Sequence, residues 1–104
     1  MKRIRLIEEV SRITHLSGEA NYTRIHLASS PDLIVCKTLS MCVDELPGFV
    51  RIHKKYAINP KFFQKAILVD NKTANVLVSD KVLPISRRRL KEVLADLWRI
   101  NSLN

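Results

Sequence analysis

The sequence predicts a mainly β domain, with short antiparallel strands in small stacked sheets, one short internal helix and one C-terminal helix. Apolar residues alternate with polar ones over many short stretches, which is the pattern of half-buried strands. Polar turn sequences such as residues 29–32 and 70–72 separate these stretches. No repeat or internal linker interrupts the 104 residues, so residues 1–104 are expected to form a single domain.

The alternation predicts short strands from the N-terminus to residue 83. They are expected at residues 4–7, 13–16, 23–27, 33–37, 49–53, 56–58, 65–69, 74–78 and 82–83. Gly18 and Gly48 fall where turns are expected, because glycine adopts turn conformations without steric cost. Many short strands of this kind indicate antiparallel pairing.

The internal helix is expected at about residues 40–45. Leu39, Val43 and Leu46 would form an apolar stripe along it. Pro47 and Gly48 follow directly and cannot continue a helix. The element is therefore predicted to be short and to pack on a sheet through one face.

The C-terminal helix is expected at about residues 87–100, with Ser86 at its N-cap. Apolar residues recur at helical spacing and form one face: Leu90, Val93, Leu94, Leu97 and Trp98. We expect Leu94 and Trp98 to pack this helix against the sheets. Trp98→Ala is then expected to cost roughly 3–5 kcal/mol of stability.

Three consecutive arginines, Arg87 to Arg89, fall in the first turn of this expected helix. Cations there cost roughly several tenths of a kcal/mol each, because the N-terminal end of the helix dipole is positive. A capping box would place an acid at position 89 instead. The three arginines would destabilise the helix, but they would place guanidinium groups beside the free backbone N–H groups at its N-terminus. This arrangement therefore predicts phosphate binding.

The charge of the chain is strongly positive, with 18 Lys and Arg against 10 Asp and Glu and a net charge of +8. The hydrophobic content of 46% indicates a packed domain rather than a disordered basic tail. Five Lys or Arg and no acid lie between Leu46 and Val69, and the same holds from Lys81 to Lys91. Two uncompensated basic tracts on a folded domain predict a surface that binds a polyanion, for which we expect DNA.

Several other classes of protein are disfavoured. No run approaches the ~18 apolar residues of a membrane span, and the N-terminus has no apolar signal core, so no membrane contact and a cytoplasmic location are expected. Cys36 and Cys42 lack zinc-binding spacing, and we expect both to be buried or half-buried structural thiols. The histidines are expected on different strands without Ser, Cys or carboxylate partners. We therefore expect no enzyme activity, no metal and no cofactor.

Three blocks of the sequence resemble one known family. Residues 49–59 resemble the F-x-R-x-H-[RK]-[SK]-[YF]-x-[VI]-N block of the LytTR DNA-binding domain, and residues 83–88 resemble its closing P-[VI]-S-R block. Upstream, residues 13–16 with residues 21–23 resemble its N-terminal block, in which a loop ending in Asn-Tyr joins two strands. The blocks occur in the order of the family and cover essentially the whole chain. Together they are specific, although each alone is weak.

The resemblance implies site residues in each block. Base contacts would come from Asn21, Lys54 and Arg87, where Asn can pair with adenine and Lys with guanine. Neighbouring residues would contact phosphates: Arg51, His53, Lys55, Arg88 and Arg89. Blander interpretations remain for each group, namely a turn residue at Asn21, a solvated edge strand at residues 51–55 and surface arginines at residues 87–89. Tyr22 is expected to form a wall of the core, with its hydroxyl at the rim.

The resemblance also implies partners. Members of the family are usually output domains of bacterial response regulators that read double-stranded DNA through loops and bind direct repeats near promoters as pairs. A receiver domain with its phosphoacceptor Asp is absent from this chain. The alternative function is a basic RNA-binding or protein-interaction module without an operator. RNA binding favours exposed aromatic residues for stacking, and the few aromatic residues here mostly fall on apolar faces.

Overall fold

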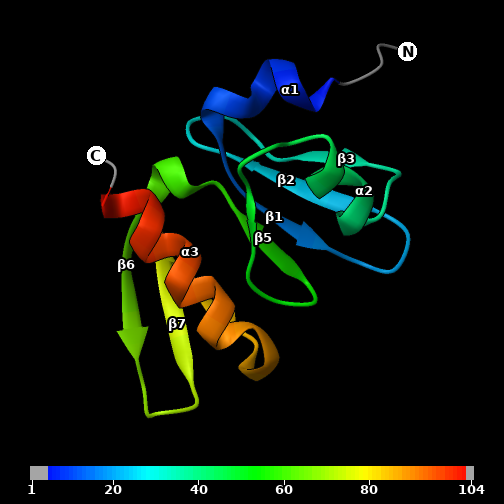
Figure 1. The fold of residues 1–104 in the computed structure, drawn as a ribbon. Helices are drawn as coiled ribbons and strands as arrows, with labels where there is room; N and C mark the ends of the chain where they lie inside the picture. The colour runs from blue at the N-terminus through cyan, green and yellow to red at the C-terminus, as the bar shows by residue number, and fades with distance from the viewer. Residues whose placement is uncertain (1–4, 103–104) are drawn as a thin grey trace.

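The computed structural model describes residues 5–102 and contains two antiparallel sheets (Figure 1). The first sheet has the strand order β3-β2-β1-β5-β4, and the second has the order β6-β7-β8. The strands are β1 (Ile13–Gly18), β2 (Thr23–Leu27), β3 (Leu33–Val35), β4 (Val50–Arg51), β5 (Tyr56–Ile58), β6 (Phe63–Leu68), β7 (Ala74–Val78) and β8 (Lys81–Ile85). The mainly β fold class predicted from the sequence is confirmed.

The helical elements lie between and after these strands. They are α1 (Leu6–Glu9), α2 (Leu39–Asp44), α3 (Leu90–Ser102) and the 3₁₀ turns η1 (Val10–Arg12), η2 (Pro60–Phe62) and η3 (Arg87–Arg89). The internal helix α2 confirms the prediction, and the Thr38 side chain caps it by accepting a hydrogen bond from the Met41 N–H. None of the helices in residues 5–102 is long and apolar enough to cross a membrane.

The strand expected at residues 4–7 is wrong, because α1 begins at Leu6. Ile4 itself lies outside the described residues. Leu6 and Val10 stand four residues apart and both pack into the core, whereas Ile7 is 55% exposed. This spacing is the period of a helix rather than of a strand. The apparent alternation was too short to distinguish the two.

The first core lies between the five-stranded sheet and the helices α1 and α2. Its buried members are Leu6, Ile13, Leu16, Ile25, Leu27, Leu39, Cys42, Leu46 and Ala57. Gly18 lets α2 approach β1, because a Cβ added there would lie 2.9 Å from Cβ of Leu39. Burial raises the pKa of the Cys42 thiol, as expected for a structural cysteine. Cys36 is exposed instead, because it follows the short edge strand β3.

The second core is formed by the three-stranded sheet, by α3, which crosses that sheet in Figure 1, and by Val50, Ile52 and Ile58 of the β4–β5 hairpin. Val93 and Leu97 are its buried helix residues. Trp98 is 74% exposed, so the prediction that it packs the helix is wrong. Successive helix residues are rotated by about 100°, and a stripe centred on Leu97 therefore leaves position 98 at its rim. Leu94 is half-buried and does pack against this core, as expected.

The arginine run does not form the first turn of an α-helix. Arg87–Arg89 form the 3₁₀ turn η3, and α3 begins at Leu90 with Glu92 in its own first turn. Ser86 has the extended backbone of an N-cap residue, but its side chain makes no capping hydrogen bond. Its buried Oγ has no hydrogen-bond partner in the described residues. Ser86 is thus the N-cap of η3 rather than of α3, and the expected capping interaction is wrong.

Candidate nucleic-acid interface

Three loops meet at one end of the molecule. The β4–β5 turn is bonded on one side to the β1–β2 loop, since the Gly18 N–H donates to the Lys55 carbonyl at 2.7 Å. On its other side it is bonded to the start of η3, since the Ser86 N–H donates to the Ile52 carbonyl at 2.9 Å. We call the surface formed by residues 19–22, 53–55 and 87–89 the basic edge.

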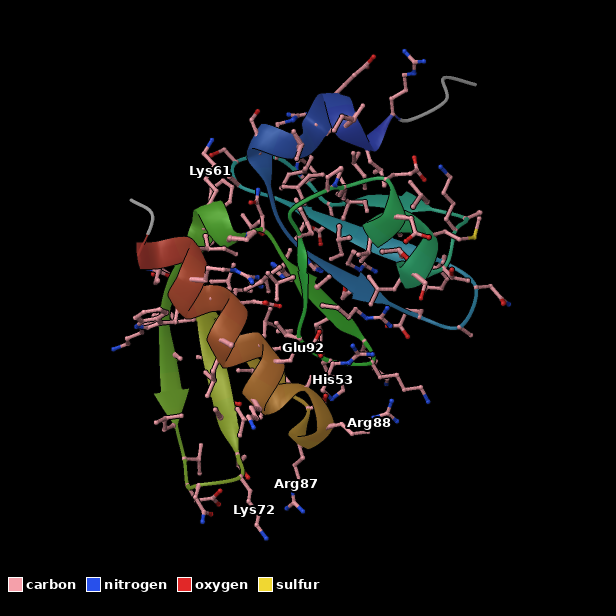
Figure 2. All side chains as sticks on the ribbon, viewed as in Figure 1. His53, Lys61, Lys72, Arg87, Arg88 and Glu92 are labelled. Atoms are coloured by element: carbon pink, nitrogen blue, oxygen red, sulfur yellow. The ribbon has the colours of Figure 1, made fainter. Side chains whose placement is uncertain are left out.

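The basic edge brings together the three residues expected to read bases. Asn21 lies in the β1–β2 loop, Lys54 at the tip of the β4–β5 turn and Arg87 in η3, and all three side chains are exposed. Figure 2 shows Arg87 and Arg88 leaving η3 in different directions, with His53 on the neighbouring turn. Each of the three sequence blocks therefore contributes one loop to the basic edge.

The positive charge of the basic edge is not neutralised within the protein. The ion pairs among residues 5–102 lie elsewhere, for example Arg12 with Glu9 at 2.6 Å and Lys37 with Glu45 at 2.6 Å. Glu19 is the acidic residue of the basic edge, and it is exposed and forms no ion pair with a described residue. The cations of this surface therefore remain available to an external anion.

The cations of the basic edge and the β4 strand repel one another. The pKa of Arg51 is lowered by burial and then by the charge of Arg89. The pKa of His53 is lowered by burial and further by the charges of Lys55, Arg89 and Arg51. Crowding of like charges is unfavourable in the free protein, and an anion bound among them would relieve it. Perturbed pKa values of this kind are common at functional sites.

His53 is held in one tautomer. Its Nδ1 accepts a hydrogen bond from the Lys55 N–H at 3.1 Å, so in the neutral ring the proton is on Nε2. Since the pKa of His53 is lowered, the ring is neutral near pH 7. It can then donate its Nε2 proton to a phosphate oxygen without carrying a charge.

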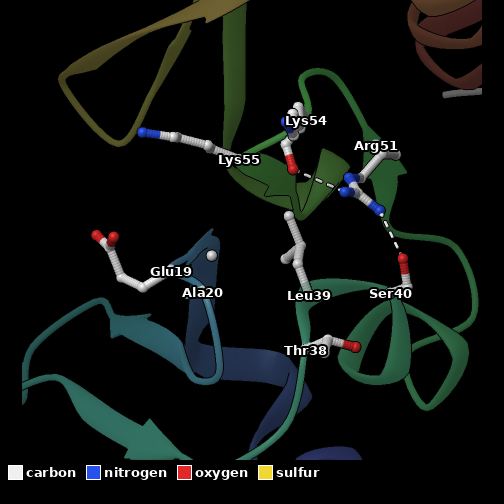
Figure 3. Close-up of a pocket in the computed structure, with 9 residues that line it drawn as sticks. Glu19, Ala20, Thr38, Leu39, Ser40, Arg51, Lys54 and Lys55 are labelled. Carbon is white, nitrogen blue, oxygen red and sulfur yellow. Dashed lines mark hydrogen bonds between the residues drawn. The ribbon is translucent and has the colours of Figure 1, made fainter.

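The Arg51 side chain is turned toward the protein (Figure 3). Its guanidinium donates to the carbonyls of His53 at 2.9 Å and Lys54 at 2.7 Å and to Ser40 Oγ of α2 at 3.2 Å. A groove of about 390 Å³ opens beside these groups, with Lys54 and Lys55 on its rim. Arg51 is thus part of the wall beneath the β4–β5 turn.

Tyr22 does not form a wall of the core as expected, because it is 37% exposed beside Asn21. The next residue, Thr23, is fully buried, and neighbouring strand residues point to opposite faces. The turn is closed by the Glu19 N–H, which donates to the Tyr22 carbonyl at 2.9 Å. The aromatic ring therefore belongs to the basic edge.

Not all residues of the basic tracts join this surface. Lys61 lies at the opposite end of the molecule in Figure 2 and donates to the Ser11 carbonyl at 3.3 Å. Lys81 lines a small cavity with His15 and His26. Sequence proximity alone did not reveal this separation.

Lys72 was not expected from the sequence but lies beside the basic edge. It is exposed in the β6–β7 turn, at the same end of the molecule as Arg87 in Figure 2. The pKa of Asp70 in that turn is lowered chiefly by the Lys72 N–H, which donates to it at 2.8 Å, and to a lesser degree by the charge of Arg87. A lone lysine two residues after an acid gives no signal in the sequence, and only the fold places Lys72 beside the basic edge.

Two histidines form a cluster away from the basic edge. The rings of His15 and His26 stack with centroids 4.0 Å apart. His26 Nε2 lies 2.8 Å from Ser17 Oγ and its Nδ1 lies 3.3 Å from Asp32 Oδ2, so the expectation that no histidine has Ser or carboxylate partners is wrong. Ser17 sits in a strand paired on both sides, where backbone N–H groups belong to the sheet. The contact between Ser17 and His26 therefore joins two paired strands, β1 and β2.

The buried His15 predicts a pH-dependent stability. Its pKa is lowered to about 4, first by burial and then by the charges around His26 and Lys81. The unfolded chain takes up this proton near pH 6.5, so stability should fall by roughly 2–3 kcal/mol as pH drops from about 6.5 to 4. Urea denaturation at several pH values should show a flatter dependence of stability on pH for His15→Gln. The pKa of the less buried His53 is also lowered, but by a smaller amount, so the control His53→Gln should keep most of this dependence. If stability depended on pH equally in the wild type, His15→Gln and His53→Gln, the lowered pKa of His15 would be contradicted.

The fold and the basic edge define a small β domain in which three loops carry a cationic surface without acidic partners among the described residues. The model of the LytTr DNA-binding domain family matches residues 2–98. The chain therefore belongs to the LytTR family of DNA-binding domains, and the resemblance seen in the sequence is confirmed.

A solved structure agrees with this assignment. The fold is similar to the LytTr DNA-binding domain of a Bacillus cereus protein assigned as a methyl-accepting/DNA response regulator, with a TM-score of 0.76 and 15% sequence identity. The match covers 85% of this chain and 83% of that chain. At this identity the similarity concerns the fold. Among curated proteins no match was found.

Proposed function

We propose that this domain binds specific sequences of double-stranded DNA as a bacterial transcriptional regulator or as the output domain of a response regulator. The observation that carries the proposal is the basic edge, where three loops of a LytTR domain meet with cations that no described acid pairs. Residues 1–104 would act as one unit. Two copies would occupy direct repeats, as the family resemblance implies.

The proposal assigns different roles to the residues of the basic edge. Asn21, Lys54 and Arg87 would contact base edges, because each is exposed in a different one of the three loops. The remaining polar and basic groups would hold phosphates: His53, Lys55, Arg88, Arg89 and the newly recognised Lys72. Phosphate contacts set affinity and register, while base contacts set sequence preference.

Competition between nucleic acids tests this function. The domain would be titrated against a labelled duplex selected from a random pool, with double-stranded DNA, single-stranded DNA and RNA of the same length as competitors. We expect the selected duplex to compete best. RNA binding remains the second candidate, because the exposed Tyr22 in the basic edge could stack on an unpaired base. Stronger competition by RNA would replace the DNA proposal.

Arg87→Ala and Arg88→Ala should have different effects although the residues are neighbours. Arg87→Ala should reduce discrimination between selected and scrambled duplex by about 1–3 kcal/mol. Arg88→Ala should weaken binding to both duplexes alike and reduce the salt slope by about one unit. Both residues are exposed, so melting temperatures should hardly change. Titrations of both variants at two salt concentrations measure this, and equal losses of specificity would make the run an undifferentiated charged patch.

A further inference from the structure

The backbone of the β4–β5 turn is almost fully engaged in hydrogen bonds within the protein. The His53 N–H donates to the Tyr56 carbonyl at 3.2 Å, and the Tyr56 N–H donates back to the His53 carbonyl at 3.2 Å. The Lys55 N–H donates to His53 Nδ1, and the Lys55 carbonyl accepts from the Gly18 N–H. Such a turn has little freedom to move.

Arg51 supplies the contacts that reach the tip of this turn. The shortest of its three hydrogen bonds, at 2.7 Å, goes to the carbonyl of Lys54, which accepts no other hydrogen bond from residues 5–102. A second holds the His53 carbonyl, and a third fastens the same guanidinium to Ser40 in α2 (Figure 3). One side chain thus connects β4, the tip of the turn and a helix of the first core.

Burying the Arg51 guanidinium costs free energy, which argues against the interpretation that Arg51 only supplies a positive charge to attract DNA. The side chain is half-buried, and both burial and Arg89 lower its pKa. It has no carboxylate partner among the described residues. An exposed lysine such as Lys54 or Lys55 supplies the same charge with less desolvation. The planar guanidinium offers instead donors in several fixed directions.

We propose that Arg51 is a positioning residue for base recognition, which holds the β4–β5 turn so that Lys54 is presented to DNA in one orientation. This inference rests on the proposed function. Three of the five N–H groups of the Arg51 guanidinium donate to the protein, so only the other two could still contact a phosphate. Base contacts depend on placement within a fraction of an ångström, whereas attraction to phosphates tolerates displacement. Loss of Arg51 should therefore affect specificity before affinity.

The test compares Arg51→Lys, which keeps the charge, with Lys55→Ala, which removes a charge from the same turn without touching the Arg51 contacts. In titrations, Arg51→Lys should lose about tenfold or more of the preference for selected over scrambled duplex, with an unchanged salt slope. Lys55→Ala should weaken both duplexes alike and reduce the slope by about one unit. An unchanged preference in Arg51→Lys would overturn the proposal.

A second readout needs no DNA. Amide exchange measured by NMR should be faster at His53 and Lys55, whose N–H groups are hydrogen-bonded within the turn, in Arg51→Lys than in the wild type or Lys55→Ala. Unchanged exchange would also overturn the positioning role. If Arg51→Lys does not fold, Ser40→Ala can be used instead, because it removes only the hydrogen bond from Arg51 to α2. It should speed amide exchange and reduce the preference for the selected duplex, both to a smaller extent. No change in either quantity would overturn the positioning role. If the wild type selects no duplex but Arg51→Lys still speeds amide exchange, DNA recognition is refuted, whereas the role of Arg51 in holding the turn is supported.

Discussion

Leu97→Ala should lower the stability of the domain by about 2–5 kcal/mol, because it removes a buried side chain from the core between α3 and the three-stranded sheet. Leu97 is 3% exposed and Val93 next to it on the helix face is 1% exposed. Urea denaturation with far-UV circular dichroism measures the loss.

The neighbouring residue provides the matched control. Trp98→Ala removes a larger side chain, but that side chain is 74% exposed, so the loss should stay below about 1 kcal/mol. The order of the two variants therefore reports the rotation of α3 about its axis. A greater loss for Trp98→Ala than for Leu97→Ala would mean that the helix presents its other face to the sheet.

Binding to duplex DNA should depend steeply on salt. If about six cations of the basic edge and its flanks neutralise phosphates, log K against log salt should have a slope near −5, which is about a thousandfold loss of affinity between 50 and 200 mM salt. The effect follows from counterion release and should appear with any duplex. Fluorescence anisotropy at four salt concentrations measures the slope.

Lys65→Ala serves as the control for this prediction. Lys65 is exposed on β6 and belongs to a basic tract, but it lies outside the basic edge. Its removal should leave the slope unchanged, whereas removal of Lys55 should reduce it by about one unit. A slope near zero in the wild type would refute the electrostatic argument, and equal effects of the two lysines would refute the boundary of the basic edge.

The strands of the domain could be predicted because alternation and turn residues act locally. Residues 23–27, 56–58 and 74–78 were predicted with the bounds that β2, β5 and β7 have in the structure. The short helix α2 followed from its apolar stripe and the Pro47 stop. In contrast, the N-terminal segment with Leu6 offers only one helical turn, too short to separate a period of 3.6 from one of 2.

The sequence predicted less well which residues make up the basic edge. The blocks located the three loops, but not which residues of the basic tracts share one surface, and Lys61 and Lys81 lie away from it. The inward orientation of Arg51 depends on Ser40, which is brought near only by the packing of α2. The exposure of Trp98 depends on the position of a helix stripe to within one residue. These features arise from tertiary contacts rather than from local pattern.

Chemical-shift mapping tests the central claim most directly. The ¹⁵N-labelled domain would be titrated with the selected duplex, and amide shifts would be followed for all assigned residues. We predict that the largest changes fall in residues 19–22, 53–55 and 87–89, with smaller ones at Lys72. Changes centred instead on the exposed side of the three-stranded sheet or on the Lys61 end of the molecule would show that the basic edge is not the DNA-binding surface.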